Sequence, residues 1–136
     1  MTKLVGITGG VGSGKTTFSN HLKKSGYLVH ESDLVVSKIY SKPKKRFLSF
    51  IKEKISQNAV KNNKINKKII TNIIFNDKKR KKILENYIHK EVQFSRDVFI
   101  KKNKKNKKKI IFADIPLLFE NNLEKNFDLV ICIISS

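Results

Sequence analysis

Eight residues near the N-terminus combine glycines, a lysine and a hydroxyl in a spacing that suits phosphate chemistry. They run Gly9-Gly10-Val11-Gly12-Ser13-Gly14-Lys15-Thr16 and match the pattern GxxxxGK[ST]. Glycines let the backbone curl so that successive N–H groups point into one concavity that phosphates can fill. In this pattern Lys15 reaches the β- and γ-phosphates of a nucleoside triphosphate and the Thr16 hydroxyl binds Mg²⁺. The alternative is a glycine-rich turn that matches by chance.

The loop lies between a predicted strand and a predicted helix, which is the context that gives the pattern meaning. Residues 3–8 form a short apolar run, and residues 15–25 carry Phe18 and Leu22 on one helical face, with Gly26 just past the end. The helix would present free N–H groups and its positive dipole end to the loop. The residues expected to hold the nucleotide are Gly10, Val11, Gly12, Ser13, Gly14, Lys15, Thr16 and Thr17.

Two carboxylates follow predicted strands that would end at the same sheet edge as the loop. Asp33 comes after the apolar strand 27–30, and Asp114 closes the apolar strand 110–114. Asp33 is placed to orient an acceptor hydroxyl and take its proton during phosphoryl transfer, or to cap a helix that starts at Leu34. Asp114 is either a carboxylate that supports Mg²⁺ or an ordinary acid at a strand end.

Residues 34–106 show helical rather than strand periodicity. Apolar residues recur at three- and four-residue spacing before Pro43, over 47–55, over 65–74 and from about Asp77 onward. Long insertions at this edge of an α/β sheet commonly carry a lid or an acceptor pocket. We therefore predict an α/β core built from residues 1–33 and 107–136, with a helical substrate-binding insertion over residues 34–106.

Composition limits the partners. The 136 residues carry a net charge of +19, but only three of the 30 basic residues are arginine. Base-reading surfaces favour arginine, and stacking sites need aromatic residues among the basic ones. The lysine-rich run 101–109 has neither, so we expect a solvated surface and no nucleic-acid partner. No apolar stretch is long enough to span a membrane and no signal peptide is expected at the N-terminus.

The remaining chemically active side chains each have an ordinary interpretation. Cys132 lies in an apolar run and has no second cysteine to pair with, which favours a buried thiol in the reducing cytoplasm. Glu120 could bind a polar substrate group or cap a loop. A lone histidine such as His89, set in an apolar helical stripe, is more often a packed residue. His21 and His30 have no metal-ligand spacing, so no zinc site is expected.

With these motifs in order, the sequence resembles the dephospho-coenzyme A kinase family over nearly its whole length. The likeness is carried by residues 7–16, by Asp33, by Ile88-His89 and by Asp114-Ile115-Pro116-Leu117-Leu118-Phe119-Glu120. The resemblance implies an α/β P-loop NTPase fold, a three-layer sandwich with a parallel sheet and a helical CoA-binding insertion. It also implies ATP-dependent phosphorylation of the 3′-hydroxyl of dephospho-CoA, the last step of CoA synthesis, with ATP and Mg²⁺ as cofactors.

The resemblance also implies roles for individual residues. Asp33 matches the family's catalytic acid and acts with Lys15, while Thr16 and Asp114 would hold the metal. The residues implied on the acceptor side are Thr8, Asp33, His89, Leu117 and Glu120. The implied partner is a small molecule, in the cytoplasm, with no membrane.

The sequence departs from the family pattern at several positions. Glu31-Ser32 stands where Asp-Ala is usual, Lys90 where a proline is usual, and Lys67 where an arginine would grip an anion with two hydrogen bonds. The family pattern also continues beyond Ser136 with a lid and its arginines. The alternatives are therefore a truncated, catalytically weak nucleotide-binding remnant, another small-molecule P-loop kinase, or a nucleic-acid-binding ATPase.

Overall fold

The computed structural model describes residues 1–10, 14–115 and 127–134. Contacts between residues divide the chain into two compact units. The sheet unit comprises Met1–Ser32 and Gln93–Ser136, and the helical unit comprises Asp33–Val92. The long helix α5, Lys78–Lys105, contributes its first part to the helical unit and its last part to the sheet unit.

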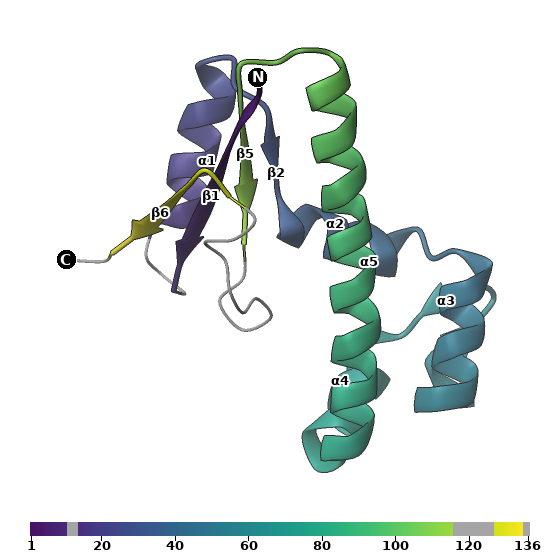
Figure 1. Ribbon diagram of the computed structural model, residues 1–136. Helices are drawn as coiled ribbons and strands as arrows, with labels where there is room; N and C mark the ends of the chain where they lie inside the picture. The colour runs from purple at the N-terminus through teal and green to yellow at the C-terminus, as the bar shows by residue number, and fades with distance from the viewer. Residues whose placement is uncertain (11–13, 116–126, 135–136) are drawn as a thin grey trace. The chain divides into compact units, whose positions relative to one another are not determined.

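The sheet unit is built on four parallel strands in the order β2-β5-β1-β6 (Figure 1). Their bounds are β1 Lys3–Gly9, β2 Val29–His30, β5 Ile110–Asp114 and β6 Leu129–Ile133. The interior strands β1 and β5 are almost wholly buried. A strand covered on both faces needs apolar residues at successive positions, which explains the uninterrupted apolar runs in the sequence.

Helices cover both faces of this sheet. On one face, Phe18 and Leu22 of α1, Lys15–Lys24, pack with Val5 and Ile7 of β1. On the other face, Phe99 and Ile100 of α5 pack against a cluster of buried strand residues, Leu4, Ile111 and Ala113. The predicted α/β fold with a parallel central sheet is thereby confirmed, as three layers.

The helical unit holds its own apolar core. Its helical elements are α2 Ser32–Ser41, which starts on the last residue of the sheet unit, α3 Lys45–Phe50, the π-helical turn η1 Ile51–Ile55, the 3₁₀ turn η2 Gln57–Ala59, α4 Lys67–Asn76 and the first part of α5. The residues buried together are Phe47, Ile51, Ile55, Ala59, Ile70, Leu84, Ile88 and Val92. The three- and four-residue spacing of apolar residues therefore marks core-facing helix surfaces, as predicted.

One element of the helical unit was not expected from periodicity. A hairpin of β3 Val60–Lys61 and β4 Lys64–Ile65 turns through Asn62 and Asn63, whose φ angles are 54° and 60°. A two-residue hairpin turn needs positive φ at both central positions, and asparagine tolerates that conformation better than most residues. The Asn-Asn pair was the signal in the sequence.

The units do not have the boundaries expected from periodicity. The insertion was expected over residues 34–106, whereas the helical unit ends at Val92 and begins at Asp33. The difference arises because α5 is one continuous helix with two packing surfaces. Leu84 and Ile88 lie in the helical core, whereas Phe99 and Ile100 pack on the sheet.

The expectation of a buried Cys132 was wrong, because its side chain is exposed. Cys132 lies on β6, which among the described residues is an edge strand paired only with β1. Side chains alternate between the faces of a strand. Ile131 and Ile133 pack with the cluster beneath α1, so Cys132 points to the opposite face, where no helix of the described residues covers it.

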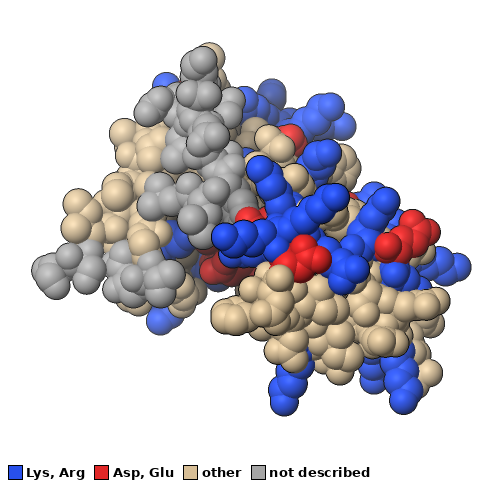
Figure 2. Space-filling view, turned by 90° about the horizontal axis from the view of Figure 1, so that it is seen from below, with Lys and Arg blue, Asp and Glu red and all other residues tan. Residues whose placement is uncertain are grey.

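Lysine dominates the surface. On the face shown in Figure 2, Lys and Arg side chains outnumber Asp and Glu. The lysines of the run 101–109 are all exposed, and Asn103, within the same run, is buried and donates to the Phe99 carbonyl at 2.8 Å. No helix in the described parts of the chain is long and apolar enough to cross a membrane.

His30 of β2 contacts two residues in the last part of α5. The side chain is buried, its Nε2 lies 3.0 Å from Ser95 Oγ, and its ring centroid lies 5.4 Å from that of Phe99. Burial, and then the charge of Arg96, lower the pKa of His30 below its ordinary value of 6.5. The folded chain therefore favours the neutral ring.

We expect Ile111→Ala to lower the free energy of unfolding by about 2–5 kcal/mol, because it opens a cavity beneath β5 where the side chain is fully buried. Urea denaturation measures the change. The matched control is Ile134→Ala, since Ile134 is 82% exposed, and it should change stability by less than about 0.5 kcal/mol. Equal losses in the two variants would contradict the described core.

The free energy of unfolding should fall as the pH is lowered through about 6.5, because the unfolded chain then binds a proton that folded His30 resists. His30→Gln should flatten this dependence between about pH 7.5 and about pH 5.5. Urea denaturation at the two pH values measures it. The control is His21→Gln, which removes an exposed histidine of α1. An unchanged slope in His30→Gln would contradict the assignment.

Candidate active site

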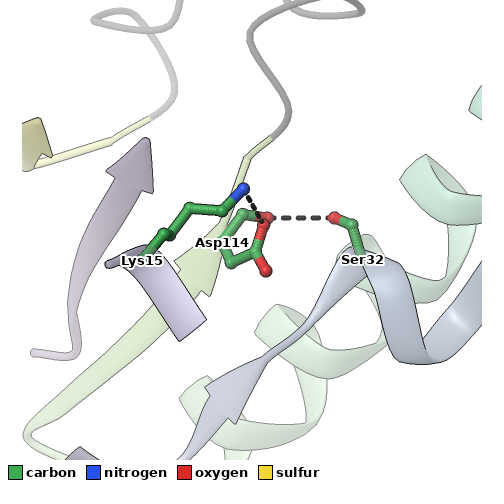
Figure 3. Close-up of polar contacts among 3 residues, drawn as sticks. All are labelled: Lys15, Ser32 and Asp114. Carbon is green, nitrogen blue, oxygen red and sulfur yellow. Dashed lines mark hydrogen bonds and ion pairs between the residues drawn. The ribbon is translucent and has the colours of Figure 1, made fainter. Parts of the chain in front are cut away.

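Lys15 and Asp114 meet because β1 and β5 run parallel and side by side. Ile7 of β1 is in register with Asp114 of β5, and the Ile115 N–H donates to the Ile7 carbonyl at 2.8 Å. Asp114 therefore lies at the end of β5, beside the end of β1 from which the chain continues into the loop and α1. Lys15 Nζ lies 3.2 Å from Asp114 Oδ1, with the two side chains 16% and 7% exposed (Figure 3). A buried carboxylate needs such a partner, since its desolvation is costly.

The start of α1 carries no side-chain cap from the described residues. Gly14, with φ of +91°, precedes the helix. The first turn has no acidic residue and Thr16 and Thr17 are exposed. The first N–H groups of a helix have no partner within it, and its dipole favours negative charge there.

The surroundings of Gly10 are open among the described residues. A Cβ placed on Gly10 would meet no atom within 4 Å. Among the described residues, no three His, Cys, Asp or Glu side chains gather to hold a metal ion. Mg²⁺ commonly binds through one or two protein ligands together with phosphate oxygens. The Thr16 hydroxyl and the Asp114 carboxylate fit that minimal set.

Ser32 lies beside Asp114, although no role was predicted for it. Its Oγ donates to the backbone carbonyl of Asp114 at 2.9 Å, and both residues are buried (Figure 3). The preceding Glu31 forms an ion pair with Lys23 of α1 at 2.5 Å.

Asp33 is exposed and lies in the first turn of α2. The interpretation of Asp33 as a cap for a helix starting at Leu34 is wrong, because α2 already begins at Ser32. A carboxylate in the first turn favours the helix dipole. Its catalytic role remains a prediction.

The residues predicted on the acceptor side lie in different surroundings, and their roles remain predictions. Thr8 is 4% exposed on β1, and its Oγ1 is enclosed without a hydrogen-bond partner among the described residues. His89 is half-buried on the part of α5 that belongs to the helical unit. The predicted residues Val11, Gly12, Ser13, Leu117 and Glu120 lie outside the described residues.

Cations of the helical unit lie close to aromatic rings or to a carboxylate. Lys67 Nζ lies 5.3 Å from the centroid of the Tyr40 ring. Arg46 pairs with Glu91 at 2.7 Å, and the Tyr87 ring stacks on Phe50 at 4.2 Å. Burial, followed by the charge of Glu91, raises the pKa of Tyr87.

Comparisons with known proteins point to one family. A family model described as dephospho-CoA kinase matches residues 3–136. The dephospho-CoA kinase of Bartonella quintana is 37% identical over 132 residues, and that of Fusobacterium nucleatum is 35% identical over 135 residues. Among solved structures, the dephospho-CoA kinase from Campylobacter jejuni is similar with a TM-score of 0.75 and 28% identity.

These matches cover nearly all of this chain and less of each relative. The Bartonella alignment covers 96% of this chain and 66% of the relative, and the Fusobacterium alignment covers 97% and 66%. The Campylobacter structure is matched over 96% of this chain and 66% of its own. The chain thus spans just under two thirds of the length of these relatives.

We expect Lys15→Met to weaken ATP binding by about ten- to a hundredfold, because it removes charged hydrogen bonds to the phosphates. Titration with a fluorescent ATP analogue measures the affinity. The control is Lys23→Met, which removes another ion-paired lysine from the same helix. Comparable affinity losses in both variants would show that general charge, rather than the loop lysine, governs binding.

Proposed function

Since the chain belongs to the dephospho-CoA kinase family, we propose that it transfers the γ-phosphoryl group of ATP to the 3′-hydroxyl of dephospho-CoA. The products are CoA and ADP, and the reaction is the last step of CoA biosynthesis. The observation that carries the proposal is the contact of Lys15 with Asp114 beside the start of α1, within a chain matched to the family over residues 3–136.

In this proposal the loop and α1 bind the triphosphate. The N–H groups at the start of α1 and the Lys15 ammonium neutralise phosphate charge, and the glycines allow the backbone to approach. Thr16 and Asp114 would hold Mg²⁺, which when bound supplies charge neutralisation across the β- and γ-phosphates. Lys15 would then leave Asp114 for the phosphates, so the ion pair of the ligand-free chain is exchanged for substrate contacts.

Asp33 is the proposed group that orients the acceptor hydroxyl and accepts its proton. Phosphoryl transfer depends on in-line placement of the nucleophile, and a carboxylate serves that purpose. The helical unit, with His89, would bind dephospho-CoA, and Thr8, Leu117 and Glu120 complete the proposed acceptor contacts. Both substrates are anions, and a chain of net charge +19 attracts them.

The proposal includes a cytoplasmic location and small-molecule partners only. It is supported by the single cysteine, which cannot form an internal disulfide, and by the scarcity of arginine and aromatic residues in the lysine-rich run.

Asp33→Asn should lower kcat by about 10²–10⁴-fold while ATP affinity is kept, because a neutral amide cannot accept the proton. ADP release with dephospho-CoA as acceptor measures kcat. The control is Asp97→Asn, since Asp97 is likewise an exposed helical aspartate, and it should turn over like the unaltered chain.

Two outcomes would contradict parts of the proposal. Unchanged turnover by Asp33→Asn would remove Asp33 from the mechanism. ATP binding by the unaltered chain without formation of CoA would favour the nucleotide-binding alternative over the kinase.

A further inference from the structure

We propose that Ser32 is a positioning residue, which holds the end of β5 so that Asp114 is presented to Lys15 and to the metal-bound triphosphate. The proposal rests on the nucleotide site of the proposed function. Ser32 would touch neither nucleotide nor acceptor, and it acts through the backbone of Asp114. The hydrogen bond from Ser32 Oγ to the Asp114 carbonyl, 2.9 Å long, carries the argument.

The Ser32 hydroxyl takes the place of the backbone N–H that would donate the next hydrogen bond between β2 and β5. Val29 pairs with Phe112, and the Phe112 N–H donates to the Leu28 carbonyl at 3.0 Å. Donors and acceptors alternate regularly along a parallel ladder. Two residues further along, that alternation would direct the N–H of residue 32 at the Asp114 carbonyl. Because β2 ends at His30 and α2 starts at Ser32, the side chain provides the donor in place of the backbone.

Burial raises the cost of losing the hydrogen bond between Ser32 and Asp114. Ser32 is 1% exposed and Asp114 is 5% exposed, so water has little access to the carbonyl. A buried carbonyl that loses its partner is costly, and the strand end would shift to find another donor. The bond therefore restrains the position of the last residue of β5 on the β2 side.

The backbone of Asp114 is held from two sides. On the β1 side, the Ile115 N–H donates to the Ile7 carbonyl, and on the β2 side Ser32 donates to Asp114 itself. The carboxylate of the same residue contacts Lys15 Nζ at 3.2 Å (Figure 3). A restrained backbone restrains the position of the Asp114 carboxylate, and a displacement of about 1 Å is enough to slow phosphoryl transfer.

Two consecutive side chains at the junction of β2 and α2 contact neighbouring elements. Glu31 forms an ion pair with Lys23 on α1, and Ser32 forms a hydrogen bond with the end of β5. Side chains thus connect the junction of β2 and α2 to α1 and to β5.

The test measures how much Mg²⁺ strengthens ATP binding. The dissociation constant for ATP is measured on the full chain by calorimetry, with Mg²⁺ and with EDTA, and the ratio is the Mg²⁺ enhancement. Ser32→Ala should reduce this enhancement by about three- to tenfold, which corresponds to one lost hydrogen bond. Its affinity for ATP in EDTA should change by less than about twofold, because Lys15 and the helix start are untouched.

A matched control separates positioning from stability. Ser19 is 2% exposed on α1 and its Oγ makes no hydrogen bond with the described residues, so Ser19→Ala removes a buried hydroxyl elsewhere in the sheet unit. The enhancement should survive in Ser19→Ala. Thermal denaturation of both variants confirms that each is folded at the assay temperature.

A double-mutant cycle tests whether Ser32 acts through Asp114. Asp114→Asn should itself reduce the Mg²⁺ enhancement, and adding Ser32→Ala to it should cause no further loss. Full enhancement in Ser32→Ala, additive losses in the cycle, or no Mg²⁺ enhancement in the unaltered chain would each overturn the proposal. Normal enhancement without CoA formation would instead refute the kinase activity and leave the role of Ser32 standing.

Discussion

The contact between Lys15 and Asp114 is the interaction on which the candidate site depends. It exists because β1 and β5 are parallel neighbours, which brings the acid that ends one strand beside the helix that follows the other. The ion pair gives a buried carboxylate a charged partner where water is scarce, and in the proposed function the same carboxylate would support a magnesium-bound triphosphate. The apolar runs of the strands serve this arrangement, since they bury the sheet on both faces.

The two units have different roles in the proposed reaction. The sheet unit supplies the rigid parallel ladder and the helix start that suit a phosphate chain. The helical unit has a separate apolar core and places cations beside aromatic rings, as Lys67 does with Tyr40. Helix α5 belongs to both, so one element with two apolar surfaces serves two cores.

Sequence patterns predicted the parts of the fold that obey a simple period or a local motif. The helix after the loop, with Gly26 at φ of +92° beyond its end, was predicted because spacing and glycine chemistry are local. The exposure of Cys132 depends on which strand lies at the sheet edge, and that is a property of topology. Ser32 was missed because its partner is a backbone atom 82 residues away, and no side-chain pattern records such a contact.

The most direct test of the central claim is a crystal structure of the chain with Mg²⁺ and a non-hydrolysable ATP analogue. The account predicts that the β- and γ-phosphates lie at the start of α1, within hydrogen-bond distance of the Lys15 ammonium, and that Lys15 has left Asp114 for them. A triphosphate bound elsewhere, with Lys15 still paired to Asp114, would contradict it.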